Sequence, residues 1–282
     1  MNDWSAWIGR EDIRHDHVDP GAVNRWLATL DRAAPADGSV PQAYHWSLCL
    51  PDAPTATLGA DGHPVREDSD DSFLPPIPLP RRMWAASKVE FIAPLRPGQS
   101  VMRSSRVASI TEKQGGTGKL VFAEVAHETH GDGALAVREI QSIVFREPAP
   151  AGAPAAPPPP GEGKFDASGW DAHRMLVPSE ALLFRYSALT FNSHRIHYDL
   201  PYATHEEGYR GLVVHGPLTA TLLLDLAALH LGDNMLQRFA FRGLSPAICG
   251  DPLHLVLRRD DDTIALAAFA ADGRQVMAAT AN

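Results

Sequence analysis

The stretch Leu218-Thr-Ala-Thr-Leu-Leu-Leu-Asp-Leu-Ala-Ala-Leu-His-Leu231 is almost wholly apolar, and it follows a Gly216-Pro217 pair that can start a helix. A helix that is apolar nearly all round must be buried on most of its sides. Four strand-like segments, separated by turn signals, come after it at 239–242, 253–258, 264–270 and 275–279. We therefore predict a sheet that curves around one central helix.

The first half of the chain shows a similar order of elements. Apolar residues at helical spacing predict an amphipathic helix over 19–32, and residues 42–50 suit one short buried helix. Strand-like segments at 85–92, 101–110, 120–127 and 135–145 then predict an antiparallel meander. The spacing Pro94-x-x-x-Gly98 recurs as Pro246-x-x-x-Gly250, which favours two similar domains over two unrelated ones.

A proline-rich segment separates the two halves. Seven of the thirteen residues 148–160 are proline, which is typical of a semi-rigid linker. We predict an N-terminal domain over 1–147, a linker over 148–164 and a C-terminal domain over 165–282. A second proline-rich run, 73–80, can form neither a helix nor a central strand, so we expect an extended loop there.

Composition limits the function. The 282 residues suit two domains of roughly 140 residues each. A net charge of −9 disfavours nucleic acid as a partner, because phosphate binding calls for a basic surface. The sequence shows neither a signal peptide nor an apolar run long enough to span a membrane. Its two cysteines, one in each half, suit a reducing compartment, so we expect a cytoplasmic protein without a membrane partner.

Four histidines lie within twenty-two residues: His194, His197, His205 and His215. His197 follows Asn192 by five residues in a segment that must turn. A histidine with a pKa near neutrality can take a proton from water and return it to carbon, and an amide beside it can orient that water. The pair suits reversible addition of water to a polarised double bond, although an isolated asparagine and histidine are more often structural.

Gly216 lies where a helix is expected to begin. The N–H groups at a helix N-terminus are free and carry a partial positive charge. The Gly216 amide is therefore a candidate donor to a carbonyl oxygen that gains negative charge during a reaction. The alternative is that Gly216 only lets the helix start close to the sheet.

Two segments carry a family resemblance: Thr190-Phe-Asn-Ser-His-Arg-Ile-His-Tyr-Asp199 and Gly211-Leu-Val-Val-His-Gly-Pro-Leu218. Together they resemble the hydratase signature of MaoC-like, R-specific enoyl-CoA hydratases. A wider pattern, which covers nearly the whole chain, includes Trp7-Ile-Gly9, the segment 74–84 and Phe241-Arg-Gly243. It resembles the subgroup that holds mesaconyl-CoA hydratase, itaconyl-CoA hydratase and the mitochondrial-type 3-hydroxyacyl-thioester dehydratases.

The resemblance implies an α+β double hotdog, in which two fused hotdog domains wrap antiparallel sheets around a central helix. It implies reversible hydration of an α,β-unsaturated acyl-CoA with no metal and no redox cofactor, coenzyme A being part of the substrate. The implied substrate is short, branched and dicarboxylic, such as mesaconyl-C4-CoA or itaconyl-CoA. The first half then resembles a degenerate hotdog, which shapes the acyl pocket and does not react.

The resemblance also implies roles for single residues. His197 matches the family's catalytic histidine, and Gly216 matches its oxyanion glycine. Asn192 stands where the MaoC-like enzymes have a catalytic aspartate, and an amide cannot act as a second base. We therefore expect His197 alone to deprotonate the water, with Asn192 positioning it and His194 tuning the site or relaying a proton.

Binding of the substrate calls for positive charge. The phosphates of coenzyme A and a free acyl carboxylate both need cations nearby, although each candidate could equally be an ion-paired surface residue. We expect Arg81 or Arg82 to clamp an acyl carboxylate. The full set of substrate-binding candidates is Arg81, Arg82, Arg195, Arg210, His215 and Arg242. The partner is an acyl-CoA, and the sequence leaves a homodimer open.

Other functions remain open from the residues alone. A dehydratase of simple 3-hydroxyacyl chains on coenzyme A or acyl carrier protein shares the chemistry, and a non-catalytic acyl-CoA binder shares the fold. A hotdog thioesterase needs an acid on the buried helix, where Asp225 is the only one. A zinc site would draw on His194, His197 and Asp199, with His205 or His215 nearby.

Overall fold

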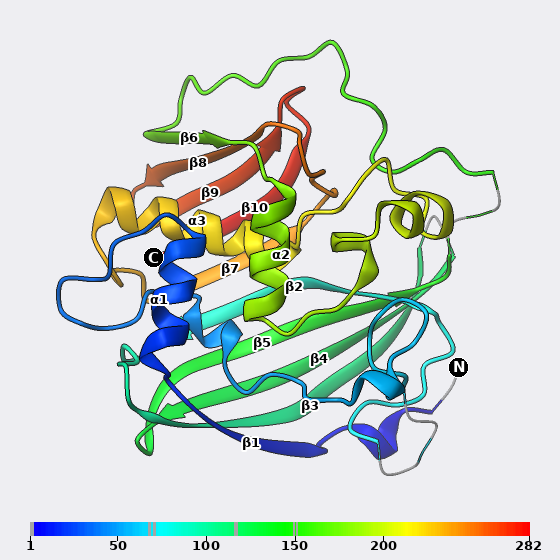
Figure 1. The fold of residues 1–282 in the computed structure, drawn as a ribbon, viewed down its shortest axis with the longest axis horizontal. Coiled ribbons are helices and arrows are strands. Elements are labelled where there is room, and N and C mark those ends of the chain that lie inside the picture. Colours follow the sequence, from blue (N-terminus) through cyan, green and yellow to red (C-terminus); the bar gives the residue numbers. More distant parts are fainter. Residues whose placement is uncertain (1–2, 67–68, 70–71, 116–117, 149, 151) are drawn as a thin grey trace.

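The computed structural model describes residues 3–66, 69, 72–115, 118–148, 150 and 152–282. Ten strands form one antiparallel sheet, and the three α-helices lie against one face of it (Figure 1). The helices are α1 (Pro20–Thr29), α2 (Glu180–Leu189) and α3 (Gly216–Leu231). The strands are β1 (Glu11–His17), β2 (Arg81–Phe91), β3 (Ser100–Gly115), β4 (Gly118–Gly131), β5 (Ala134–Arg146), β6 (Ala172–Leu176), β7 (Arg238–Gly243), β8 (Leu253–Asp260), β9 (Thr263–Ala270) and β10 (Gln275–Ala281).

The strand order is the same in the two halves when each is read from its edge to the centre. The order across the sheet is β1-β3-β4-β5-β2-β7-β10-β9-β8-β6, so β2 and β7 pair at the centre. Each half contributes an edge strand, a helix (α1 or α2) and then four further strands in the same sequence, and the second half adds α3 before its four strands. This is the internal repeat that the sequence predicts. The domain boundaries themselves stay a prediction, because the sheet is continuous across them.

Helix α3 is the central helix that the apolar run predicts. Its residues from Leu218 to Ala227 are all buried, and it packs against β6, β8 and β9. Pro217 occupies the first turn, where its missing N–H costs no hydrogen bond, and Gly232 ends the helix at a φ of 107°. The position of α3 follows from burial of an apolar surface on nearly every side.

The only acid on α3, Asp225, is buried and ion-paired on both oxygens. Oδ1 accepts from Arg32 at 2.7 Å, and Oδ2 accepts from Arg174 at 2.6 Å. These two arginines come from opposite halves of the chain, so the pair ties the halves together beside the helix. A buried carboxylate with both oxygens in ion pairs has a structural role.

The edge strands β1 and β6 are not among the strands that the sequence predicts. β1 has the sequence Glu-Asp-Ile-Arg-His-Asp-His, and it alternates exposed and half-buried residues. An edge strand faces water along its open side, and charged residues there prevent pairing with other chains. The apolar alternation that marks an inner strand is therefore missing in β1, and β6 is likewise half-buried at best.

The segments rich in proline lie on the body of the protein. Ile77 and Leu79 of the 73–80 loop are buried in an apolar cluster with Val121, Ala123 and Phe145. In the predicted linker, the Ala156 N–H donates to the Gly208 carbonyl at 2.8 Å, so this segment lies along 208–210. No helix in the described part of the chain is long and apolar enough to cross a membrane.

Candidate active site

A cavity of about 1180 Å³ lies between the two halves. Both halves line it: the first half contributes residues of β2 and of the 58–64 loop, and the second contributes the segment 190–198 and the start of α3. Among the predicted site residues, those that line the cavity are Arg81, Arg82, Asn192, His194, His197, His215 and Gly216.

His197 is buried and lies in a single 3-10 turn, Arg195–His197. Its Nδ1 donates to the Val213 carbonyl at 2.7 Å. Because a carbonyl oxygen only accepts, Nδ1 carries the proton and Nε2 carries a lone pair. Burial, followed by the charge that His215 would carry, holds the pKa of His197 well below its ordinary value. The ring is therefore a neutral base at neutral pH.

His215 forms a flat platform under His197. The ring centroids are 3.5 Å apart and the planes differ by 19°. The Nε2 atom of His215 is hydrogen-bonded to Ser187 Oγ at 2.8 Å, and Nδ1 has no partner in the described part of the chain. Burial lowers the pKa of His215 to about 3. His215 thus contacts the catalytic candidate by its ring face, and its role in substrate binding stays a prediction.

Gly216 is the first residue of α3 and lines the same cavity as His197. A Cβ atom added there would meet only the Trp84 carbonyl, at 3.7 Å, which is ordinary contact. No acceptor for the Gly216 N–H is found among the described residues. The free N–H at the positive end of a sixteen-residue helix is a suitable donor to an oxyanion.

Asn192 and His194 are held in place by hydrogen bonds around the 190–198 segment. The Oδ1 atom of Asn192 accepts the backbone N–H of His194 at 3.0 Å. The Nε2 atom of His194 lies 3.3 Å from Glu207 Oε1, and Glu207 is also ion-paired with Arg81. Burial opposes ionisation of Glu207, but the hydrogen bond from His194 and the charge of Arg81 hold its pKa below the usual value.

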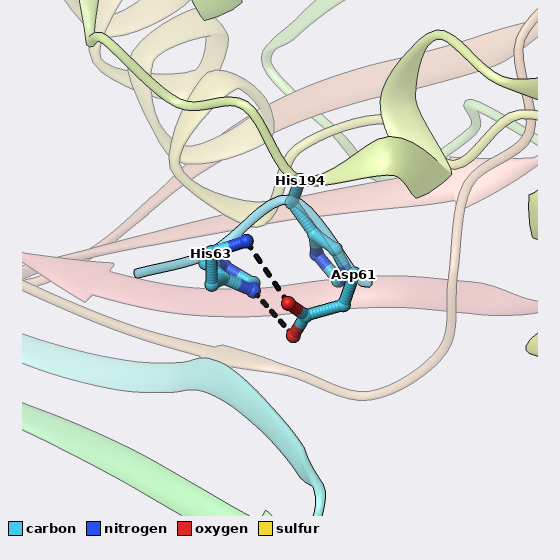
Figure 2. Close-up of side chains that lie close together, drawn as sticks. All are labelled: Asp61, His63 and His194. Atoms are coloured by element: carbon cyan, nitrogen blue, oxygen red, sulfur yellow. Dashed lines mark hydrogen bonds and ion pairs between the residues drawn. The ribbon is translucent and has the colours of Figure 1, made fainter. Parts of the chain in front are cut away.

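An aspartate and a histidine from the first half reach this site, and the sequence did not predict them. The Nδ1 atom of His63 lies 3.0 Å from Asp61 Oδ2, and the backbone N–H of His63 donates to Oδ1 at 3.0 Å (Figure 2). The His63 ring packs on the His194 ring with centroids 4.1 Å apart. No local pattern reveals this pair, because its partner loop lies more than a hundred residues away.

The 58–64 loop is tightly seated on the 190–198 segment. The Arg195 N–H donates to the Asp61 carbonyl at 2.9 Å, and the Ser193 hydroxyl donates to the Gly62 carbonyl. Gly62 has a φ of +85°, and a Cβ atom there would fall 2.0 Å from the Ser193 carbonyl oxygen. Only glycine permits this close approach of the two backbones.

Asp61, His63 and His194 are residue types that bind divalent cations, and their ligand atoms lie within 4.8 Å of one another. Hydrogen bonds within the site engage part of this set. Both oxygens of Asp61 accept from His63, and His194 Nε2 faces Glu207. The zinc set considered from the sequence is not brought together among the described residues, where the candidate ligand group is Asp61, His63 and His194, and Asp199 is ion-paired with Arg195.

The candidate arginines fall into two groups. Arg195 is paired with Asp199 at 2.7 Å, Arg210 is paired with Asp251, and Arg242 is exposed on β7; none of these three lines the cavity. Their role in phosphate binding stays a prediction. Arg81 lines the cavity but is ion-paired with Glu207.

Arg82 is the exception among these arginines. It is half-buried, it lines the cavity, and it forms no ion pair within the described residues. Within the described residues, its guanidinium forms one hydrogen bond, a long contact of 3.5 Å to the Pro64 carbonyl. Burial lowers the pKa of its guanidinium, and the charge of Asp61 partly opposes that effect. A cation in this state is ready to bind an anion of the substrate.

The first half also brings a buried carboxylate to the cavity wall. Glu139 accepts from the Trp46 indole N–H at 3.1 Å and from the Ser87 hydroxyl, and His45 Nε2 lies 3.4 Å away. Burial favours the neutral acid, but the nearby His45 ring keeps the pKa of Glu139 below its usual value. The hydrogen bonds from Trp46 and Ser87 hold the carboxylate in place, which suits a wall that shapes the pocket.

Comparison with solved structures defines the fold class. A MaoC-like dehydratase has a TM-score of 0.73 at 16% identity, covering 98% of both chains. A MaoC-like dehydratase from Phytophthora capsici has a TM-score of 0.72 at 13% identity, covering 99% of this chain and 98% of that one. A Mycobacterium tuberculosis protein described as a double hotdog has a TM-score of 0.59 at 14% identity, covering 97% and 95%. The predicted double hotdog is confirmed.

Sequence comparison then gives the family. The family model for hydroxyacyl-thioester dehydratase type 2 matches residues 43–249, and the chain belongs to this family of hydro-lyases. The mesaconyl-C(4)-CoA hydratase of Chloroflexus aurantiacus is 44% identical over 283 residues, covering 99% of this chain and 97% of that protein. A mitochondrial hydroxyacyl-thioester dehydratase type 2 of Schizosaccharomyces pombe is 42% identical over 86 residues, covering 29% of this chain and 28% of that protein. The resemblance predicted from the sequence is therefore confirmed.

Proposed function

We propose that the protein hydrates the double bond of a short, branched, dicarboxylic enoyl-CoA, with mesaconyl-C4-CoA as the first candidate. The observation that carries the proposal is the neutral imidazole of His197 in the same cavity as the free N–H of Gly216. The full-length similarity to a mesaconyl-C(4)-CoA hydratase supports the choice of acyl group.

The chemistry proceeds from these two groups. The Gly216 N–H stabilises negative charge on the thioester oxygen as electrons leave the double bond. The lone pair on His197 Nε2 takes a proton from water, and the water oxygen bonds to the β-carbon. The protonated His197 then delivers its proton to the α-carbon as the thioester carbonyl re-forms. The reaction calls for no metal or redox cofactor, which stays a prediction, as do the homodimer and the cytoplasmic location.

The dicarboxylic substrate is favoured by Arg82. A half-buried guanidinium without an ion pair in the described residues is costly unless an anion joins it. The free carboxylate of the acyl group is an anion of the right size and charge. A substrate with a simple acyl chain is the second candidate, and it would leave Arg82 without a partner.

The thioesterase alternative loses its candidate residue. Both carboxylate oxygens of Asp225 are engaged by arginines, and Asp225 does not line the cavity. A buried carboxylate in two ion pairs is a poor nucleophile or base. We therefore rank hydration above thioester hydrolysis.

One experiment tests the proposal directly. Purified protein is mixed with mesaconyl-C4-CoA, and loss of enoyl absorbance is followed together with release of free thiol. We expect absorbance to fall without thiol release, and we expect His197→Ala to lose at least about a hundredfold in kcat while remaining folded. Thiol release, or an unchanged rate in His197→Ala, would contradict the proposal.

A further inference from the structure

A water molecule that attacks a double bond must be oriented through both of its hydrogens. In the proposed reaction one hydrogen goes to His197 Nε2, so a second acceptor has to face the same water. The Oδ1 atom of Asn192 already accepts the His194 N–H at 3.0 Å, and Nε2 of His194 faces Glu207, so both side chains are engaged in holding the 190–198 segment. An acceptor from the opposite wall of the cavity would leave these contacts intact.

The pair Asp61 and His63 offers that acceptor from the first half. Burial alone would raise the pKa of Asp61, but hydrogen bonds from the His63 ring and backbone hold it far below its ordinary value. An ionised carboxylate only accepts, so the 3.0 Å contact places the ring proton on Nδ1 of His63. The Nε2 atom of His63 is then a lone-pair acceptor.

The position of His63 beside the reacting groups is set by packing. His63 lines the cavity together with Asn192, His194 and His197. Its ring packs on His194 at 4.1 Å, and the His194 and His197 rings are 5.5 Å apart. The backbone contact at Gly62 keeps the loop from shifting.

We propose that His63, oriented by Asp61, is the second acceptor for the attacking water. The inference rests on the proposed hydration. One O–H bond of the water breaks and its proton moves to His197, while the other O–H donates to His63 Nε2. The oxygen–β-carbon bond forms, the double-bond electrons move to the thioester oxygen, and His197 returns its proton to the α-carbon. His63 begins and ends neutral.

The test uses two variants of His63 that distinguish the packing of its ring from the acceptor role of its nitrogen. His63→Phe keeps the packing on His194 but has no acceptor, whereas His63→Gln offers an amide oxygen to the water. We expect kcat of His63→Phe to fall on the order of a hundredfold with KM within about threefold, and His63→Gln to recover part of that loss. His17→Phe, on the exposed edge strand β1, is the matched control and should keep wild-type kcat.

The outcomes are distinguishable. His63→Phe with wild-type kcat, in a protein whose His197→Ala variant is inactive, would overturn the role of His63 and leave the proposed function standing. One bound divalent metal per chain that disappears in His63→Phe would also overturn it, since the cluster would then be a metal site. A wild-type protein that hydrates none of the enoyl-CoAs offered would overturn the function and this inference with it.

Discussion

The imidazole of His197 stacks on that of His215 at a centroid separation of 3.5 Å, while its Nδ1 donates to the Val213 carbonyl. The stack and the hydrogen bond hold one tautomer and one ring orientation. Burial lowers the pKa of both rings, so both stay neutral at neutral pH.

Turnover should be insensitive to mild acid. His197 acts as a base only when neutral, and burial, followed by His215, holds its pKa well below 6.5. We expect kcat to stay flat as the pH falls to 6.5 and to decline only at lower pH. A pH–rate profile with saturating substrate checks this. A decline centred at or above pH 6.5 would show that His197 is not the base.

Stability should depend on pH through the same pair. Burial lowers the pKa of His215 in the folded protein to about 3, compared with 6.5 for a free side chain. A lowered pKa in the folded state gives stability that is present above the unfolded pKa and is lost as the pH falls. We expect the free energy of unfolding, measured with urea, to fall as the pH drops from 6.5 toward 3. His215→Phe keeps a ring but cannot titrate, so its decline should be smaller.

Removing the Gly216 N–H should reduce turnover. Gly216→Pro eliminates the donor at a helix position where proline is tolerated, and loss of one oxyanion donor typically costs about 10²- to 10³-fold in kcat. Gly216→Ala is the matched control, because it keeps the N–H and its Cβ would meet only the Trp84 carbonyl, at 3.7 Å. Equal rates in the two folded variants would remove the oxyanion role.

Arg82 should determine preference for a carboxylate. Arg82→Gln removes the charge that we expect to bind the acyl carboxylate, so kcat/KM for mesaconyl-C4-CoA should fall by about 10- to 100-fold. For an enoyl-CoA without the second carboxylate, kcat/KM of Arg82→Gln should fall by less than about threefold. Arg81→Gln breaks the ion pair with Glu207 and should affect both substrates alike. If Arg82→Gln lowers kcat/KM equally for both substrates, Arg82 does not bind the acyl carboxylate.

Gly62 should be essential for joining the two loops of the site. Gly62→Ala places a Cβ 2.0 Å from the Ser193 carbonyl oxygen in a left-handed backbone at a φ of +85°. Gly98→Ala is the control for backbone strain, since Gly98 has a φ of +89° and nothing within 4 Å. Both should lose about 1–2 kcal/mol of stability from strain, but Gly62→Ala should lose more than Gly98→Ala because of the backbone clash, and only Gly62→Ala should also lose kcat. Equal activity in the two would show that the loop position does not matter.

The central elements of the fold could be predicted because their residues carry local signals. The apolar run gave α3, and the alternating segments gave the eight inner strands β2–β5 and β7–β10. Strands β1 and β6 could not be predicted, since polar and charged edge residues replace the alternation of apolar and polar residues that marks an inner strand. The short helix expected in 42–50 is the 3-10 turn Tyr44–Ser47. The Trp26 ring packs on the Tyr44 ring with centroids 5.6 Å apart.

The candidate site could be predicted only where its residues are close in sequence. Asn192, His197 and Gly216 belong to one segment and its following helix, and the structure brings all three to one cavity. Asp61 and His63 reach that cavity through contacts made across more than a hundred residues, and no sequence period encodes such a contact. The sequence does not distinguish Arg81 from Arg82, and the ion pair of Arg81 with Glu207 does.

The pairing of β2 with β7 joins the halves by five residue pairs, from Ala86 opposite Arg242 to Glu90 opposite Arg238. A hinge that opened the two halves would break this ladder and the central part of the sheet. Ligand exchange should therefore proceed with this ladder intact, and the cavity should keep the same two-sided wall in the free and the occupied protein.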